Sequence, residues 1–188
     1  MVDPVAVPLP DWDESTRPTT STYDEIGADE RAAGQHLTAI HDMYRQGLAQ
    51  VSAVLDQVVD GAAGLGEARE AVRQLGLRTA VERAGSFCGQ LCRAVESHHR
   101  IEDAYLYPAL RIADSGLGGV LDRLDSEHLV VHELLVRLDD TLVAVTRDPD
   151  RLGVLVEEFT HLRRLLESHF VYEEQQIGGA LGVHRITV

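Results

Sequence analysis

Two copies of a histidine–glutamate pair constrain this chain more than any other feature. His98 and Glu102 lie four residues apart, and His169 and Glu173 repeat the pair 71 positions later (169 − 98 = 71). The dipeptide Glu-Ser precedes the histidine in both copies. Residues four apart on an α-helix project from the same face, so each copy offers an imidazole nitrogen and a carboxylate oxygen to one neighbour.

A pair of histidines with the same spacing, His128 and His132, lies between the two copies. Imidazole combined with carboxylate suits iron, zinc or manganese far better than calcium or magnesium. The three pairs together predict a transition-metal site inside a bundle of helices.

Composition narrows the class of protein. A chain of 188 residues with 44% hydrophobic residues fits one globular domain. The net charge of −14 argues against a nucleic-acid partner, because phosphate polymers are held mainly by clustered lysine and arginine. No run of about 18 apolar residues exists, so no membrane span is expected. The start of the chain has no basic region ahead of an apolar stretch, and we expect a cytoplasmic protein.

The first 26 residues differ from the rest of the chain. They contain four of the six prolines and show no apolar periodicity, which predicts an extended N-terminal arm at 1–26 with Trp12 as its anchor. Helical periodicity follows, so we expect a four-helix bundle at 27–180. Four amphipathic helices without a convincing strand favour an all-α, antiparallel, up-down-up-down arrangement.

Local signals set the expected helix boundaries. The first helix is expected at 29–60, and the second runs from a capping box at Thr79–Glu82 to about Ala113, with Leu91, Ala94 and Tyr105 on its inner stripe. Pro108 predicts a kink or an early end within this helix. A third helix follows the turn at 115–119. The last starts at Asp148-Pro149 and ends near Gln176, before Gly178-Gly179.

Helical phase selects among the nine histidines. His36 and His41 are five apart and point about 140° away from each other, and only His41 shares the stripe of Leu37 and Leu48. Periodicity alone leaves His98 and His99 ambiguous. The internal repeat favours His98, because Phe170 occupies the position that corresponds to His99.

The predicted metal ligands are therefore five histidines and two glutamates on inward faces. Burying seven such groups without partners would cost several kcal/mol, which a metal centre would remove. They are His41, His98, Glu102, His128, His132, His169 and Glu173.

Other candidate residues are given lesser roles. Glu174 is the alternative to Glu173 on the last helix. His99, His161 and His184 are interpreted as solvated residues or as neighbours of a ligand. Cys88 and Cys92 are interpreted as small buried hydrophobes, and a redox-responsive pair is the alternative.

Four motifs together give a specific resemblance. They are His41-Asp-x-x-Arg45, His98-His-x-x-Glu102-Asp-x-x-Leu-Tyr-Pro-Ala-Leu, Glu127-His128-x-x-x-His132 and Ser168-His169-x-x-Tyr172-Glu173-Glu174. The series covers residues from about 30 to 177 and resembles the hemerythrin family, in its bacterial HHE cation-binding branch. The resemblance implies an up-down four-helix bundle that holds two irons bridged by an oxygen and two carboxylates.

The resemblance also implies a role for each matching residue. The five predicted histidines would be terminal ligands, and Glu102 would bridge with Glu173 or Glu174. Oxygen-carrying members place an aspartate five residues after the last histidine, where this chain has Glu174. The internal repeat instead favours Glu173, and we take Glu173 as the expected bridge.

The expected ligand count leaves room for a small molecule. Two six-coordinate irons need about twelve positions, and this donor set with one bridging oxygen fills about eleven. The open position predicts binding of O₂, NO or peroxide, for oxygen or iron binding or for sensing. The alternative is a di-iron enzyme, an oxidase or a consumer of peroxide or NO. The sequence does not decide between them, nor whether the acidic surface docks a reductase.

Overall fold

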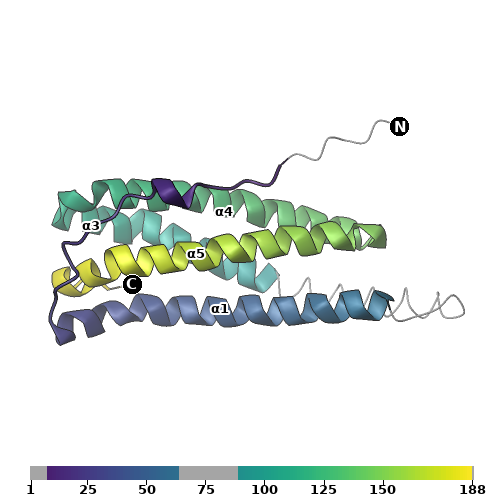
Figure 1. Ribbon diagram of the computed structural model, residues 1–188, viewed down its shortest axis with the longest axis horizontal. Helices are drawn as coiled ribbons and strands as arrows, with labels where there is room; N and C mark the ends of the chain where they lie inside the picture. Colours follow the sequence, from purple (N-terminus) through teal and green to yellow (C-terminus); the bar gives the residue numbers. More distant parts are fainter. Residues whose placement is uncertain (1–7, 64–88, 188) are drawn as a thin grey trace, which may run out of the picture.

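Four long helices run alongside one another in the computed structural model, which describes residues 8–63 and 89–187 (Figure 1). They are α1 (Ala28–Ala63), a second helix (residues 89–113), α4 (Gly118–Val145) and α5 (Leu152–His184). Within these two stretches there is no strand, so the predicted all-α four-helix bundle is confirmed. No helix in the described part of the chain is both long and apolar enough to cross a membrane.

Short capped turns join the second helix to α4 and join α4 to α5. The side chain of Asp114 accepts a hydrogen bond from a backbone amide of the 3-10 turn η4 (Ser115–Leu117), which leads into α4. Asp148 does the same for η5 (Pro149–Arg151), which leads into α5. These carboxylates satisfy amide groups that have no partner within the turn, and the expected helix start at Asp148-Pro149 is confirmed. The predicted capping box at Thr79–Glu82 lies outside the described residues.

The hydrophobic core is divided into two apolar clusters by a polar layer. The layer interrupts the apolar stripe between Leu37 and Leu48 on α1, between Leu124 and Val131 on α4, and between Phe170 and Ile177 on α5. Because apolar residues close both ends, polar groups in this layer are shielded from water on two sides.

Helix α5 is longer than expected, because Gly178-Gly179 does not end it. The helix continues to His184 and ends at Arg185, which adopts a left-handed conformation with φ of 55°. The glycines serve close helix packing instead. A Cβ atom on Gly34 of α1 would overlap the backbone of Gly178, and one on Gly182 would overlap the backbone of Glu30. Small residues thus allow α1 and α5 to approach at this end of the bundle.

The second helix contains a π-helical turn, η3 (Glu102–Leu106), where a kink or an early end was expected. The backbone N–H of Tyr107 bonds to the carbonyl of Glu102, and the helix then continues as α3 (Tyr107–Ala113) with Pro108 in its first turn. Proline lacks an N–H group, so a change of hydrogen-bond register just before it leaves no donor missing. The π turn also buries Tyr107 and exposes Tyr105, at 1% and 74%, and the expected inward position of Tyr105 is therefore wrong.

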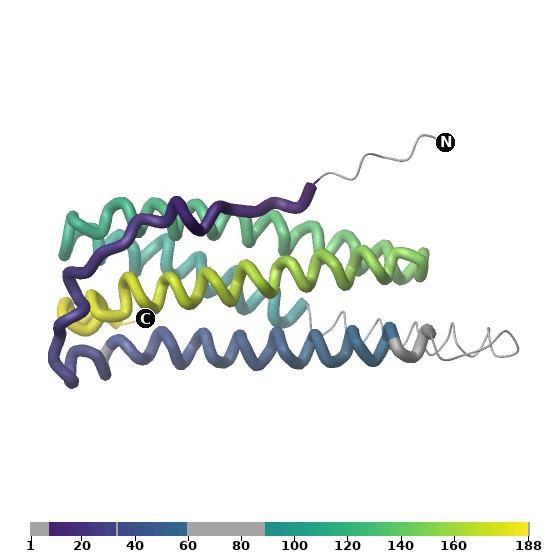
Figure 2. Tube along the Cα trace, in the orientation of Figure 1, coloured from purple at the N-terminus to yellow at the C-terminus, as the bar shows by residue number. Residues whose placement is uncertain are grey.

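The N-terminal arm follows the bundle from residue 8 to residue 27 (Figure 2). It is extended except for a 3-10 turn, η1 (Glu14–Thr16). Trp12 packs against one apolar cluster, Arg137 of α4 donates to the carbonyl of Pro8, and Tyr172 of α5 donates to the carbonyl of Pro18. The arm thus covers the joint face of α4 and α5.

Candidate metal centre

Seven side chains from all four helices meet at the polar layer in two adjacent groups. Each is at most 6% exposed. One group is His41 of α1, His98 and Glu102 of the second helix, and Glu173 of α5; the other is His99 of the second helix, His128 of α4 and His169 of α5. Within each group, one nitrogen or oxygen atom from every residue lies within 4.8 Å of the others.

Imidazole nitrogens face each other within each group. The Nε2 atoms of His41 and His98 are 3.0 Å apart, and those of His128 and His169 are 3.1 Å apart. When both nitrogens of such a pair carry lone pairs, they repel each other unless a proton or a cation lies between them.

The two buried carboxylates reach toward both groups. Glu102 lies 3.0 Å from Nε2 of His98 and 3.7 Å from Nε2 of His128. Glu173 lies 3.3 Å from Nε2 of His41 and 3.9 Å from Nε2 of His169. Carboxylates placed between two sets of imidazoles suit two neighbouring cations that share them.

Three of the histidines are oriented by a carboxylate on their outer side. The Nδ1 atoms make the following contacts: His41 with Glu174 at 2.8 Å, His128 with Asp103 at 2.7 Å, and His169 with Glu127 at 3.1 Å. A proton on Nδ1 leaves the lone pair on Nε2, which then points into the centre. Metal-binding histidines are commonly fixed by such outer carboxylates.

An approximate two-fold relation links the halves of the centre, as the sequence repeat suggested. His41 bonds to Glu174, the residue after Glu173, and His128 bonds to Asp103, the residue after Glu102. The ring of Phe170 stacks on His41 at 4.3 Å between centroids, and the ring of His99 stacks on His128 at 3.9 Å. The halves therefore differ mainly in that one carries phenylalanine where the other carries histidine.

The environment keeps most of these imidazoles neutral. Burial lowers the pKa of His98 to about 3, and it also lowers the pKa of His169 and, more strongly, that of His99. A neutral imidazole retains the lone pair that a metal requires. Burial also acts on His41, but the carboxylate of Glu173, 3.3 Å from Nε2, and that of Glu174, hydrogen-bonded to Nδ1, outweigh it and raise the pKa of His41.

The pKa values of the two buried carboxylates, Glu102 and Glu173, shift in opposite directions. Burial and the neighbouring charge of Glu173 raise the pKa of Glu102 well above its usual value. Burial acts on Glu173 in the same sense, but the close approach of His41 and the electrostatic interaction with His169 and His128 lower the pKa of Glu173. Glu102 therefore favours its protonated form, whereas Glu173 favours its charged form.

Several inward-facing atoms have no hydrogen-bonding partner in the described stretches. They are both carboxylate oxygens of Glu102, Oε2 of Glu173 and Nε2 of His99. The approach of His98 to Glu102 is short but lacks hydrogen-bond geometry. Buried acceptors without donors cost free energy, and a metal cation would bond to them directly. The donor set fits a transition metal, since it combines imidazole with carboxylate.

Tyr107 is a buried phenol that the sequence motif Leu-Tyr-Pro-Ala-Leu contains but to which no role was assigned. Its hydroxyl donates to Oε1 of Glu173 at 2.7 Å and lies 3.4 Å from Nε2 of His128. Burial raises its pKa well above the usual value, so the phenol keeps its proton. Proline at 108 was the one signal of a register change that could have revealed it.

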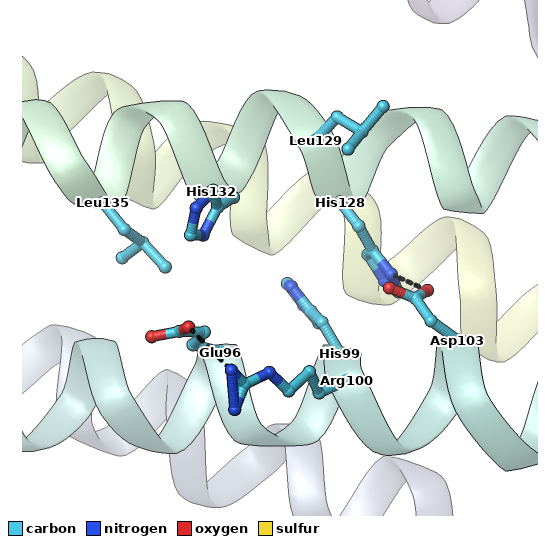
Figure 3. A pocket seen from close by; sticks show the side chains of 8 residues that line it. All are labelled: Glu96, His99, Arg100, Asp103, His128, Leu129, His132 and Leu135. Carbon is cyan, nitrogen blue, oxygen red and sulfur yellow. Dashed lines mark hydrogen bonds and ion pairs between the residues drawn. The ribbon is translucent and has the colours of Figure 1, made fainter.

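The structure does not bring His132 into the centre. Its side chain is exposed, because four residues on an α-helix advance the direction by about 40° and move His132 to the flank of α4. There it lines a cavity of about 300 Å³ together with His99 and His128 (Figure 3). His99 is 6% exposed, buried rather than solvated, and supplies the fifth imidazole of the cluster.

The structure separates the two glutamates of α5. The carboxylate of Glu173 is fully buried among the histidines, whereas Glu174 lies outside them. Glu174 accepts hydrogen bonds from His41 and, at 2.8 Å, from Arg45. Glu173 thus lies among the clustered histidines, and Glu174 orients a neighbouring imidazole from outside.

Glu127 is a further residue that the sequence analysis quoted only as part of a motif. It contacts His169 and accepts hydrogen bonds from Arg17 of the arm and Arg123 of α4. Burial opposes its ionisation, but these three partners lower the pKa of Glu127 to about 2. A charged carboxylate is therefore held directly behind one of the clustered histidines.

Comparison with known proteins agrees with this arrangement. The family model for the hemerythrin HHE cation binding domain matches residues 33–181, which is well over half of the chain. No curated protein and no solved structure matches the chain. The matched range contains all seven clustered side chains and most of each of the four helices. The chain belongs to the hemerythrin HHE cation-binding family.

Proposed function

We propose that this protein holds two iron ions with a bridging oxygen and binds O₂, or another small molecule such as NO or peroxide, at one of them. The observation that carries the proposal is a set of four buried atoms that have no hydrogen-bond partner in the described residues. They are both carboxylate oxygens of Glu102, Oε2 of Glu173 and Nε2 of His99. Glu102 and Glu173 would bridge the ions. His41 and His98 would bind one ion, and His99, His128 and His169 the other.

The fifth imidazole keeps the ligand count at the expected level. Exchanging His132 for His99 leaves five imidazoles and two bridging carboxylates, which fill about eleven of about twelve positions with the bridging oxygen. A ferrous pair would supply electrons to a bound oxidant. The chain orients the histidines through outer carboxylates, and its apolar clusters exclude water from both ends.

A surface cavity would give a small molecule access to the ion held by His99, His128 and His169. The cavity lined by His99, His128 and His132 reaches from the surface to the imidazoles of this group (Figure 3). On the other side, Phe170 covers His41. A small molecule would therefore approach the ion held by His128 and His169.

One observation favours a di-iron enzyme as a second candidate. The phenol of Tyr107, which keeps its proton, can donate a hydrogen bond from its hydroxyl, which lies 2.7 Å from Glu173 and 3.4 Å from His128. A consumer of peroxide or NO needs such a donor, and a reversible carrier does not.

Metal analysis and optical spectroscopy test the proposal. Protein from iron-replete cells should contain about two irons per chain, and the reduced form should give a stable adduct with O₂ that reverses under vacuum. One iron or fewer per chain would contradict the dinuclear centre. Rapid decay of the adduct with turnover would favour the enzyme.

A further inference from the structure

Arg17 connects the N-terminal arm to the metal centre. Its side chain is 10% exposed, and its guanidinium makes a two-point contact with the carboxylate of Glu127, at 2.7 Å from Nε and 2.8 Å from Nη2. Its remaining nitrogen donates to Oγ of Ser168 at 2.8 Å. Two-point contacts between arginine and a carboxylate are strong and directional.

Glu127 differs from the other carboxylates that orient histidines. Its side chain is fully buried, whereas Asp103 is 47% exposed and Glu174 is 18% exposed. Water can stabilise those two, but Glu127 depends on Arg17 and Arg123. Removing one of these guanidinium groups would leave a buried charge with half its counter-charge.

The arm holds Arg17 in place by several contacts along the bundle. The guanidinium lies between two aromatic rings, 4.6 Å from the centroid of Tyr172 and 5.6 Å from that of Trp12. Just beyond it, Tyr172 bonds to the carbonyl of Pro18, and the amide of Thr20 bonds to Gln176. Release of the arm would therefore remove Arg17 from Glu127.

We infer that Arg17 is a positioning residue for His169, and that docking of the arm and binding of metal at His128 and His169 stabilise each other. The inference rests on the proposed function. His169 must present Nε2 to the metal, and Glu127 secures this orientation by accepting from Nδ1. Because coupling between two binding events is reciprocal, metal must strengthen arm docking as much as docking strengthens metal binding.

The chain contains a built-in reporter of this coupling. Trp12 is its only tryptophan and lies on the arm. In a titration of metal-free protein with Zn²⁺, which is spectroscopically silent, the emission of Trp12 should shift as metal binds. In R17Q, this shift should disappear, and Zn²⁺ affinity at one site should fall about 10- to 100-fold. R17K should recover part of the affinity.

Arg163→Gln is the matched control. It removes an ion pair with Glu167 on α5 that involves neither the arm nor the clustered side chains, and it should leave Zn²⁺ affinity unchanged. The Co²⁺-loaded R17Q protein should also show an altered visible absorption band, which loosening of the arm alone would not produce. Wild-type protein that binds no metal would contradict the proposed function. Wild-type protein that binds two metals, with R17Q indistinguishable from it, would overturn the inference alone.

Limited proteolysis covers the case in which R17Q does not fold. Chymotrypsin can cut the wild-type arm after Trp12 and Tyr23, so no substitution is needed. Metal should slow both cleavages by about the same factor by which arm docking strengthens metal binding. Equal cleavage rates with and without Zn²⁺ would show that the arm and the metal are independent.

Discussion

His99 lies face to face with His128, with ring centroids 3.9 Å apart and ring planes 9° from parallel. In the other half of the centre the same place is taken by Phe170, which lies against His41. The exchange of a phenyl ring for an imidazole puts an additional nitrogen donor on one side only. The two groups of side chains are therefore chemically different, and the group beside the cavity is the richer in nitrogen.

His99→Ala and His132→Ala should have different effects on metal content. His99 is buried in the cluster and His132 is exposed. We expect His99→Ala to weaken one metal at least 10-fold, whereas His132→Ala keeps both. Plasma emission spectrometry after dialysis against a chelator measures both variants. Loss of metal only from His132→Ala would show that α4 rotates on metal binding so that His132 faces the centre.

Substitutions of the two glutamates of α5 should also differ in their effect on metal binding. Glu173→Gln should abolish the dinuclear centre, because it removes a charge that both groups share. Glu174→Gln should keep two metals but bind them about 10- to 100-fold more weakly, because it disturbs the contact with His41. Chelator competition measures the affinities. The reverse order of effects would identify Glu174 as the bridge.

Metal loading should release protons from Glu102 and His41. The raised pKa values of Glu102 and His41 mean that the metal-free protein holds protons there at a pH where the unfolded chain has lost them. Their stabilisation of the metal-free fold is complete below the unfolded pKa of each group and is lost as pH rises through the folded value. Metal must displace these protons, so its apparent affinity rises with pH. Calorimetry in buffers of different ionisation enthalpy gives the number released, which Glu102→Gln should lower.

Tyr107→Phe should destabilise the metal-free protein by about 1–3 kcal/mol, because it leaves an oxygen of buried Glu173 without its donor. The metal-loaded protein should lose less, since the metal satisfies the same carboxylate. Tyr105→Phe is the matched control at an exposed position of the same helix and should change neither form. Urea unfolding with and without metal measures the difference.

Two glycines of α5 should respond oppositely to alanine. At Gly178 a Cβ atom meets nothing within 4 Å, so alanine should stabilise the helix by about 0.5–1 kcal/mol. At Gly182 a Cβ atom would overlap the backbone of Glu30, and alanine should cost about 1–3 kcal/mol. Chemical unfolding of both variants gives the sign. Equal stabilisation by both would show that α1 and α5 do not pack so closely.

Most of the fold could be predicted because apolar residues recur at helical spacing through the bundle. Six of the seven clustered side chains follow from that spacing and from the repeat. The glycines of α5 were misleading, since glycine both ends helices and permits close packing, and only a neighbouring helix decides which. His132 shares the spacing of a ligand pair, but the 40° advance of a four-residue step is decided by how α4 is rotated in the bundle.

The remaining differences arise from tertiary structure. Tyr105 and Tyr107 exchange places because the π turn shifts the helical phase, and no periodicity in the sequence encodes that shift. The link from Arg17 through Glu127 to His169 joins residues more than a hundred positions apart. Such a link cannot be read from local spacing.

The π turn at Glu102–Leu106 changes the direction in which side chains of the second helix point after it, compared with an uninterrupted α-helix. In an uninterrupted α-helix, residues five apart point about 140° away from each other, so a helix that directs Glu102 toward the clustered histidines would turn Tyr107 away. The bond between their backbones instead places them one above the other. The π turn thus absorbs a single additional residue, and deleting Ala104 or Tyr105 would convert it into an α-helical turn in which Glu102 and Tyr107 are four positions apart and the phenol still faces the centre.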